Sequence, residues 1–331
     1  MKVTIIGAGS WGTAMSIYMA SCGHEIHLWA YEEGLADTIN HHHVNPLYLD
    51  GFPIPDNVTA TDDVMEALKQ EGVIFLAIPS QFIRRTLKDV ASSYQGQPLV
   101  CLSKGIEQGT LSLMSEVLTD ILGTGLPLLA LSGPTFAREV AGGLPAAAVL
   151  ASTDLQLCGK LQEAFSSEKF RFYRSDDLIG VELAGALKNV IALAAGVVDG
   201  YKLGLNAAAA LMTRGLHEIT RLGVELGGRR ETFAGLAGMG DLILTCTGHL
   251  SRNRTVGVRL GKGETLEDIL GSMNMVAEGV ATTASTFELA RSRGVEMPLT
   301  ESVYDLLYSG IPPGDIVLRL MTRNLKREDV L

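Results

Sequence analysis

The sequence predicts an α/β protein in two parts: an N-terminal part built on a doubly wound, mostly parallel sheet, and an all-α C-terminal domain. Three observations lead to this prediction. Short apolar runs alternate with amphipathic segments up to about residue 175, a glycine-rich turn follows the first run, and only helical patterns continue further along the chain.

Seven apolar runs in the N-terminal part have the length and composition of buried strands. Amphipathic stretches such as "DVMEALKQE" and "TLSLMSEVLTDIL" separate some of them, as expected of helices that cover a parallel sheet. The runs are "KVTIIGAG", "HEIHLWAY", "GVIFLAIPS", "PLVCLSKG", "PLLALSGP", "PAAAVLAS" and "KFRFYRS".

Beyond "RSDDLIG" the pattern changes to helices without convincing strands. This change alone sets the expected boundary, which divides the chain into residues 1–178 and 179–331. The expected helices span Val181 to Val198, Asn206 to Leu226, Leu266 to Gly271, Thr282 to Arg293 and Thr300 to Tyr308.

The composition fits a globular protein with large cores and argues against two classes of partner. The chain has 331 residues, of which 47% are hydrophobic, enough for two domains. Its 27 basic and 37 acidic residues give a net charge of −10, which disfavours nucleic acid and anionic membranes as partners. An anionic substrate would therefore need a local basic site.

Neither a membrane span nor an export signal is expected. The uncharged run from Ile121 to Ala137 is 17 residues long and broken by two prolines and three glycines. Met1 and Lys2 lead directly into "VTIIGAGSWG", which leaves no room for a signal-peptide core. We therefore expect a cytoplasmic protein. The scattered cysteines match neither a zinc spacing nor a disulfide framework, so we expect reduced packing residues and no metal. They are Cys22, Cys101, Cys158 and Cys246.

The segment "VTIIGAGSWGTA" places Gly7, Gly9 and Gly12 in a G-x-G-x-x-G pattern between an apolar strand and a helix. The first glycine permits the tight turn, the second lets the main chain approach a pyrophosphate, and the third lets helix and strand pack closely. The helix N-terminus then attracts the phosphates. In this context the pattern predicts a Rossmann-like dinucleotide-binding domain; the alternative is a glycine-rich turn in an unliganded α/β domain.

The second apolar run ends in "HLWAYEE", where such domains distinguish their cofactors. An acid there holds the ribose of NAD, and an arginine nearby accommodates the 2'-phosphate of NADP. Ala30 and Tyr31 come first in this chain, with Glu32 and Glu33 beyond. Tyr31 has a ring suited to stacking on adenine. These residues do not decide whether the cofactor carries a 2'-hydroxyl, as in NAD, or a 2'-phosphate, as in NADP.

Residues that follow the later apolar runs are candidates for ligand contacts, because ligands bind at the carboxyl ends of parallel strands. Lys104 after "LVCLS" would place a cation at this edge, unless it is an ordinary exposed loop lysine. Gly133 and Thr135 in "SGPTFARE" offer backbone and hydroxyl groups beside a probable helix start, which suits an anion or a hydroxyl.

Lys188 lies in the middle of the apolar stretch "VELAGALKNVIALAAGVVDG". No residue three or four positions away can pair with it, and the nearest acid, Glu182, lies on another side of the helix. One interpretation is a lysine that snorkels to water. The other is a lysine desolvated in a cleft, where burial makes it readier to exchange a proton with a substrate.

The segment "GLAGMGDLILTCTGHLSRNRTVG" combines a glycine-dense turn, an acid and a polar cluster. Asp241 is placed either to cap the following helix or to take part in a site. Ser251 is expected to cap a second helix, with Arg252 at its start. A helix N-terminus with an adjacent guanidinium is a good phosphate site, although a solvated basic helix end is the simpler alternative.

Two histidine features are interpreted without function. His41 to His43 are read as a polar loop, because three consecutive side chains point in different directions and no acid or cysteine partner is evident. His217 lies among Arg214, Glu218 and Arg221, which indicates charge pairing on a helix surface.

Taken together, these segments closely resemble the NAD(P)-dependent glycerol-3-phosphate dehydrogenases, nearly from end to end. The segments that carry the resemblance are "GAGSWGTA", "SKGIE", "SGPTFAREV", "VELAGALKNVIALAAGVVDG", "NAAAALMTRGLHE", "GMGDLILTCTG", "SRNRTVG" and "VAEGV". The resemblance implies a Rossmann domain followed by a helical domain, a dimer in many members, and interconversion of dihydroxyacetone phosphate and sn-glycerol 3-phosphate for glycerophospholipid synthesis.

The resemblance also implies roles for individual residues. Lys188 matches the family's catalytic proton donor and acceptor. Cofactor positions are Ser10, Trp11, Tyr48, Ala137, Val276 and Glu278, in addition to the glycines. Substrate-pocket positions are Lys104, Gly133, Thr135, Asn189, Asp241, Thr245, Ser251, Arg252 and Asn253, of which Lys104 and Arg252 are also expected to touch the cofactor. Where many members that look suited to NADPH have a basic residue after the second strand, this chain has Ala30 and Tyr31, so NADH and NADPH both remain open.

The implied reaction fits the residues. A ketone reduced by hydride needs a proton donor beside its oxygen and a cation to stabilise the charge, roles expected of Lys188 and Lys104, with Asp241 orienting the lysine. The Ser251 to Asn253 helix start would hold the phosphate. The alternatives are another two-domain dehydrogenase, of the β-hydroxyacid or ketopantoate reductase type, and a non-catalytic dinucleotide sensor.

Overall fold

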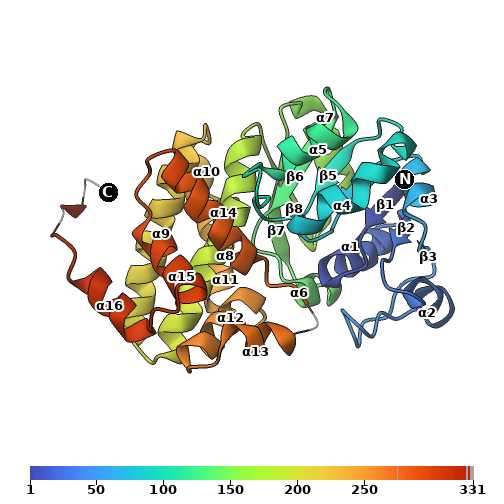
Figure 1. Cartoon of the computed structure of the whole chain (residues 1–331). Helices are drawn as coiled ribbons and strands as arrows, with labels where there is room; N and C mark the ends of the chain where they lie inside the picture. Colours follow the sequence, from blue (N-terminus) through green and yellow to red (C-terminus); the bar gives the residue numbers. More distant parts are fainter. Residues whose placement is uncertain (274, 326, 329–331) are drawn as a thin grey trace. The chain divides into compact units, whose positions relative to one another are not determined.

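The computed structural model describes residues 1–273, 275–325 and 327–328, and the chain divides into two compact units. Unit 1 comprises Met1–Lys104 and Ser112–Glu182, and unit 2 comprises Gly105–Leu111 and Leu183–Leu331. Figure 1 draws the elements of both. Each unit is described by itself.

Unit 1 contains one eight-stranded sheet in the order β3-β2-β1-β4-β5-β6-β7-β8. All neighbouring strands run parallel except β6 and β7, which are antiparallel, so the predicted doubly wound, mostly parallel sheet is confirmed. Each of the seven apolar runs forms a strand. The strands are β1 (Lys2–Ile6), β2 (Glu25–Trp29), β3 (Val58–Thr61), β4 (Val73–Leu76), β5 (Leu99–Cys101), β6 (Leu128–Ser132), β7 (Ala146–Ala151) and β8 (Phe170–Ser175).

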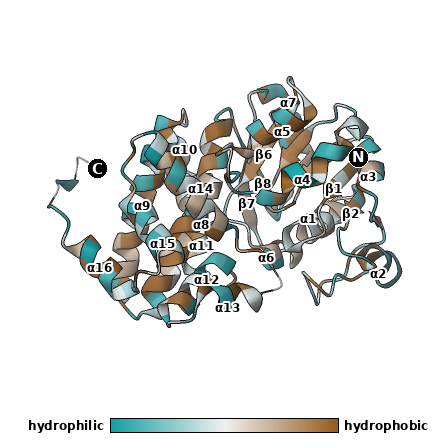
Figure 2. Ribbon diagram, in the orientation of Figure 1, coloured by the Kyte–Doolittle hydropathy of each residue, from teal (hydrophilic) through white to brown (hydrophobic). Residues whose placement is uncertain are grey.

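The two faces of the sheet bury separate hydrophobic cores. Along β1, Ile5 belongs to one core and Ile6 to the other, and Phe75 and Leu76 divide in the same way along β4. Side chains alternate between the faces of a strand, so a strand buried on both faces is apolar throughout. All three residues of β5 and the first four of β6 are apolar and buried, and Figure 2 shows hydrophobic colour at β6.

The helices of unit 1 supply the other half of each core. α1 and α7 pack on the core that contains Ile5, and α3, α4 and α5 pack on the core that contains Ile6. The helical segments are α1 (Ser10–Ser21), α2 (Leu35–His42), α3 (Val64–Lys69), η1 (Ser80–Phe82), α4 (Ile83–Leu87), η2 (Lys88–Ser93), α5 (Met114–Leu122), α6 (Ala137–Ala141) and α7 (Leu155–Phe165).

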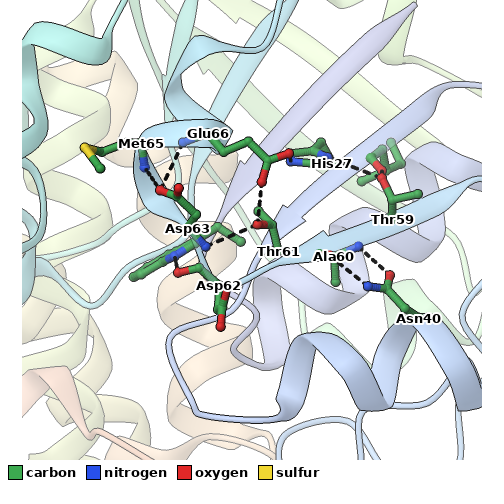
Figure 3. Close-up of polar contacts among 11 residues, drawn as sticks. His27, Asn40, Thr59, Ala60, Thr61, Asp62, Asp63, Met65 and Glu66 are labelled. Atoms are coloured by element: carbon green, nitrogen blue, oxygen red, sulfur yellow. Dashed lines mark hydrogen bonds and ion pairs between the residues drawn. The ribbon is translucent and has the colours of Figure 1, made fainter.

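Strand β3, which the apolar runs did not indicate, is the edge strand beside β2. Its four residues, "VTAT", are too few and too polar to form a run. The side chain of Asn40 on α2 bonds both main-chain groups of Ala60, accepting from its N–H at 2.7 Å and donating to its carbonyl at 2.9 Å. Figure 3 shows this contact beside the polar cluster around Thr61 and Glu66.

Among its described residues unit 2 contains helices and no strand, which confirms the prediction of an all-α second part. The predicted helices are all present, with ends shifted by up to four residues. The helices of this part are α8 (Leu178–Gly200, whose first turn belongs to unit 1), α9 (Leu205–Glu225), α10 (Arg230–Ala234), the π-helix η3 (Leu236–Gly240), α11 (Asp241–Thr247), α12 (Arg252–Gly261), α13 (Leu266–Gly271), α14 (Glu278–Ser292), α15 (Pro298–Tyr308) and α16 (Pro313–Met321).

Helix α8 is long, apolar and mostly buried. By length and composition it is the one helix among the described residues that is apolar enough to cross a membrane, and 78% of its most apolar window is buried within the structure. An apolar helix buried on all sides is typical of a protein core.

Two glutamates, the half-buried Glu182 and the buried Glu218, each hold the N-terminus of a helix distant in sequence. Glu182 accepts from the N–H and the hydroxyl of Ser115 in α5. Glu218, 2% exposed, accepts from the N–H groups of Leu299 and Thr300 in α15. Burial raises the pKa of each carboxyl to about 7. The interpretation of Glu218 as a helix-surface charge is therefore wrong, because α15 covers it.

The histidine cluster does not form the expected loop. His41 and His42 end α2, and His43 follows in the left-handed conformation at φ 54°. Among the described residues no group of three His, Cys, Asp or Glu side chains is placed to hold a metal.

Candidate active site

The glycine turn of unit 1 has the geometry that each glycine predicts. A Cβ on Gly7, where φ is +118°, would lie 2.8 Å from the carbonyl oxygen of Ala77, and one on Gly12 would lie 1.8 Å from that of Gly7. Gly9 differs, because no described atom lies within 4 Å of its Cβ position. The two outer glycines serve packing, and the middle one leaves open space at the start of α1.

The start of α1 has the character of a phosphate-binding site. Gly9 is its N-cap and has no side chain that could cap the first turn, which begins with Ser10, Trp11 and Gly12. Uncapped N–H groups at the positive end of a helix bind phosphates. The residues present therefore fit a dinucleotide.

Hydrogen bonds from the segment between α2 and β3 reach both this turn and Glu32, just after the end of β2. The Ser10 hydroxyl donates to the carbonyl of Tyr48 at 2.8 Å, and the amide of Asn45 donates to that of Ala8 at 2.8 Å. The Tyr48 hydroxyl donates to Glu32 at 2.5 Å. Tyr31 is 71% exposed, with one edge against Trp29. Asn45 was missed in the sequence, although "NP" in a loop is a turn signal.

Three residues predicted at the strand ends of unit 1 lie together. Lys104 Nζ donates to the Gly133 carbonyl at 3.4 Å, and the Thr135 hydroxyl donates to the same oxygen at 3.1 Å. A Cβ on Gly133 would lie 2.8 Å from the Cα of Ala148 in β7, so only glycine fits there. Ala137 is the first residue of α6, two positions beyond Thr135.

Lys188 is buried with a partner on another helix. Its Nζ lies 2.8 Å from Oδ1 of Asp241 and 2.7 Å from the hydroxyl of Thr245, both on α11. Lys188 is 6% exposed and Asp241 2%. The snorkelling interpretation is therefore wrong, because the charge is held inside the protein.

The capping interpretation of Asp241 is also wrong. Gly240 occupies the N-cap of α11, and Asp241 is its first residue, with the carboxylate on Lys188. Thr245, one turn later, donates to the main-chain carbonyl of Asp241 at 2.6 Å and accepts from Lys188. Burial raises the pKa of the neighbouring Cys246 thiol to about 12, so this thiol stays neutral beside the ion pair.

The second predicted helix start is present at α12. The Ser251 side chain accepts from the N–H of Arg254 at 3.2 Å, which confirms Ser251 as the cap. Arg252 is the first residue of the helix and its side chain is exposed. This end of α12 thus combines backbone donors with a guanidinium.

Asn253 connects three helices of unit 2. Its Nδ2 donates to Oδ1 of Asn189 on α8 at 2.9 Å, and its Oδ1 accepts from the N–H of Gly279 in α14 at 3.0 Å. Glu278 is the first residue of α14, and Val276, 42% exposed, lies just before it. The predicted substrate position at Asn253 and the predicted cofactor position at Glu278 are therefore joined by one amide.

Glycines bring α12 directly onto α8. A Cβ on Gly257 would lie 2.0 Å from the Leu193 carbonyl oxygen, and one on Gly196 would lie 2.1 Å from that of Arg254. Gly200 and Gly261 meet the opposite helix in the same way. This contact fixes the start of α12 on the helix that carries Lys188. The sequence analysis overlooked the signal, which is a pair of glycines four residues apart on each helix.

The predicted residues fall into two groups. Unit 1 contains the glycine turn, Tyr31, Tyr48, Lys104, Gly133, Thr135 and Ala137, and unit 2 contains Lys188, Asn189, Asp241, Thr245, Ser251, Arg252, Asn253, Val276 and Glu278. Each group is brought together within its own unit. That Lys104 and Lys188 serve the same substrate stays a prediction.

Comparison with known proteins identifies the family. The model of the NAD-dependent glycerol-3-phosphate dehydrogenase N-terminus matches residues 2–158, and the model of the C-terminus of the same family matches residues 177–318. The chain belongs to the NAD-dependent glycerol-3-phosphate dehydrogenase family. A glycerol-3-phosphate dehydrogenase (NAD(P)+) of Citrifermentans bemidjiense is 49% identical over 332 residues, which cover 99% of each chain.

Solved structures agree with this family. The glycerol-3-phosphate dehydrogenase of Coxiella burnetii superimposes with a TM-score of 0.93 at 39% identity, covering 97% of this chain and 99% of that one. A ketopantoate reductase family protein of Ralstonia eutropha reaches a TM-score of 0.60 at 16% identity, covering 93% of this chain and 97% of that one. That second likeness concerns the fold alone, so the comparisons favour the glycerol-3-phosphate dehydrogenases over the alternative dehydrogenases.

Proposed function

We propose that this chain interconverts dihydroxyacetone phosphate and sn-glycerol 3-phosphate with NAD(P)H. The observation that carries the proposal is the buried Lys188, bound to Asp241 and Thr245 within the segment that matches the family's C-terminal model. A charged pair costs free energy to bury, so its presence in an apolar helix calls for a function.

Unit 1 provides the cofactor site. The backbone donors at the start of α1 bind the pyrophosphate, and the space at Gly9 admits it. When bound, the nicotinamide supplies a hydride to C2 of the ketone or accepts one from the alcohol.

Lys188 provides the proton. In reduction, an N–H bond of the ammonium breaks as an O–H bond forms on the C2 oxygen, and the amine is left neutral. Asp241 holds the ammonium in place and balances its charge before the transfer, while Thr245 fixes its direction. Lys104 stabilises the charge that develops on the substrate oxygen.

The substrate's phosphate binds at the start of α12. Backbone N–H groups, the helix dipole and the exposed guanidinium of Arg252 all favour a dianion there. Asn253 has its carbonyl oxygen bound to Gly279 and one N–H bound to Asn189, so it contacts the substrate through its remaining N–H. This local site lets a chain of net charge −10 bind an anionic substrate.

We make further proposals from the sequence pattern, the net charge and the family. Residues 1–178 act as the cofactor-binding domain and residues 179–331 as the substrate-binding and catalytic domain. The protein acts as a homodimer in the cytoplasm, with neither nucleic acid nor membrane insertion involved. Its product feeds glycerophospholipid synthesis.

Steady-state kinetics test the proposed reaction. Oxidation of the reduced cofactor is followed at 340 nm with dihydroxyacetone phosphate, with unphosphorylated dihydroxyacetone and with ketopantoate. We expect turnover with the phosphorylated ketone and a kcat/KM at least about a hundredfold lower without the phosphate. Equal rates with and without the phosphate would rule out the phosphate site at α12.

The two alternatives make different predictions in the same assay. A ketopantoate reductase would turn over ketopantoate in preference to the phosphorylated ketone. A dinucleotide sensor would bind the cofactor without turnover, and a Lys188→Met variant would behave like the parent.

A further inference from the structure

Glu32 lies at the point of unit 1 where the adenosine ribose of a dinucleotide is recognised. It follows the end of β2 by three residues and Gly12 by 20. The N–H of Gly7 donates to the carbonyl of Trp29, the last residue of β2, so the glycine turn and this strand end are adjacent. In dinucleotide-binding domains an acid about 20 residues after the glycines accepts from the ribose 2'-hydroxyl.

The carboxylate of Glu32 is held in place. Tyr48 donates to Oε1 at 2.5 Å, and the main-chain carbonyl of Glu32 accepts from the N–H of Leu35 at the start of α2. Burial, with Glu32 beside it, raises the pKa of Tyr48 to about 12, so the phenol remains a hydrogen-bond donor.

The residue that holds Glu32 is itself attached to the phosphate-binding turn. The Tyr48 carbonyl accepts from Ser10 at 2.8 Å, and its N–H donates to Asn45, whose amide donates to Ala8. A cofactor that binds its pyrophosphate at this turn therefore meets a carboxylate whose distance from the turn is set by hydrogen bonds. The fixed carboxylate of Glu32 cannot move away from a 2'-phosphate without losing these hydrogen bonds.

The surrounding sequence provides no cation for a 2'-phosphate. Between Lys2 and Lys69 there is neither Lys nor Arg, while nine acidic residues occur there. This stretch includes the ends of β2 and β3, and Figure 3 shows Asp62, Asp63 and Glu66 in the segment that follows β3. Arg138 of α6 reaches the stretch, and its guanidinium lies over the ring of Phe52 and donates to the carbonyl of Asp50.

The histidines of the same stretch do not replace a guanidinium. Burial lowers the pKa of His27, which leaves the ring neutral near Glu66. His41 bonds the carbonyl of Asp37, and His43 lies 3.7 Å from Asp56. A 2'-phosphate would add about two negative charges next to Glu32. The residues from Lys2 to Lys69 provide no permanent cation between them to balance these charges.

We propose that Glu32, held by Tyr48, is the residue that selects an unphosphorylated adenosine ribose, so that this chain uses NADH in preference to NADPH. This inference rests on the proposed function and deepens it, since the family includes enzymes named for either cofactor. Glu32 accepts from the ribose hydroxyls of NADH and repels the 2'-phosphate of NADPH. Tyr48 acts as a positioning residue.

Direct binding tests the proposal without turnover. Dissociation constants for NADH and NADPH are measured by calorimetric titration of the full chain, and AMP and adenosine 2',5'-bisphosphate are compared as competitors of NADH. We expect the parent to bind NADH about a hundredfold more tightly than NADPH, because like charges forced together at a site cost several times the thermal energy. AMP should also compete better than the bisphosphate.

Variants of two neighbouring acids distinguish a specific role of Glu32 from the effect of removing any negative charge in this region. In Glu32→Gln the preference should shrink to within about tenfold, and in Glu32→Arg it should reverse. Glu33→Gln is the matched control, because Glu33 is exposed next to Glu32 and its loss removes the same charge. It should keep the parent preference. Tyr48→Phe should weaken NADH binding while it leaves NADPH binding nearly unchanged.

Two results would overturn the proposal: a parent that binds NADPH as tightly as NADH, or a Glu32→Gln variant that keeps the full preference. Failure of the proposed function has a different signature. If NADH binds a hundredfold more tightly than NADPH and dihydroxyacetone phosphate is not reduced with either, Glu32 keeps its role and the proposed reaction is wrong. If the ketone is reduced and the two cofactors bind equally, the reaction stands and the role of Glu32 is wrong.

Discussion

The candidate sites of the two units consist of different kinds of chemical group. In unit 1 the key groups are main-chain atoms at turns, and glycine is needed because a Cβ would collide with a carbonyl or occupy the ligand's space. In unit 2 the proposed proton donor is a charged side chain on a helix, Lys188, buried against partners 53 and 57 residues away. A site made of main-chain groups tolerates the loss of a side chain. In a site made of buried charges, a substitution that removes a catalytic group also lowers the free energy of unfolding.

The largest effect should follow removal of the buried lysine. Lys188→Met should lower kcat about a thousandfold or more, since the proton donor is lost. It should also cost about 3–5 kcal/mol of unfolding free energy, because the buried carboxylate of Asp241 loses the ammonium that balances its charge. Activity assays and urea unfolding measure the two losses.

A paired substitution separates chemistry from folding. Adding Asp241→Asn to Lys188→Met should restore most of the stability and none of the activity, because both buried charges are then removed. Lys262→Met, at an exposed position after α12, is the control and should match the parent. Recovery of activity in the double variant would contradict the role of Lys188.

The buried glutamate of unit 2 should make stability depend on pH. The folded pKa of Glu218 is about 7 against an ordinary 4.5, so the protein gains stability from the protonated form below pH 4.5 and loses it as the pH rises towards 7. The loss amounts to about 3 kcal/mol. In Glu218→Gln the fall in unfolding free energy between pH 4.5 and 7 should shrink by about this amount.

The control for this pH effect is Glu225→Gln, an exposed glutamate on the same helix α9. Its pH profile of stability should follow the parent. A Glu218→Gln profile that also follows the parent would show that Glu218 does not titrate in this range.

Glycine contacts between α8 and α12 should give a smaller loss. Gly257→Ala forces a methyl group to within 2.0 Å of a carbonyl oxygen, so the helices must separate, at a cost of about 2 kcal/mol. The KM for the phosphorylated substrate should rise more than kcat falls, because the start of α12 moves. Gly271→Ala, where no described atom lies within 4 Å, should leave stability unchanged or slightly raised. Equal stability of the two variants would contradict close packing of α8 and α12.

The smallest effect on folding, and the sharpest test of the comparison, is expected at Gly9. Gly9→Ala should keep the parent's unfolding free energy, because its Cβ position is open, and should weaken cofactor binding about tenfold, because the pyrophosphate needs that space. Gly12→Ala should instead destabilise the fold. If Gly9→Ala lost stability and kept its cofactor affinity, the assignment of the middle glycine to the ligand would be wrong.

The same contrast explains what could be predicted from the sequence. The glycine turn and seven strands could be predicted because the pattern that indicates each one lies within a few consecutive residues. Strand β3 was not, since "VTAT" gains its place from pairing with β2 and from Asn40. The partner of Lys188 could not be deduced from its own helix, and Glu218 was misread because α15, some 80 residues on, covers it. The family resemblance indicated Asp241 and Thr245 where periodicity alone could not.

Asn40 has a consequence for how the protein behaves in concentrated solution. An edge strand presents unpaired main-chain groups that another chain can bond, which is a common route to aggregation. At β3 the amide of Asn40 already occupies both groups of Ala60, in the middle of that edge. A second molecule would have to break two hydrogen bonds before it could add a strand. One side chain on α2 thus hinders the addition of a strand at the β3 edge of the sheet.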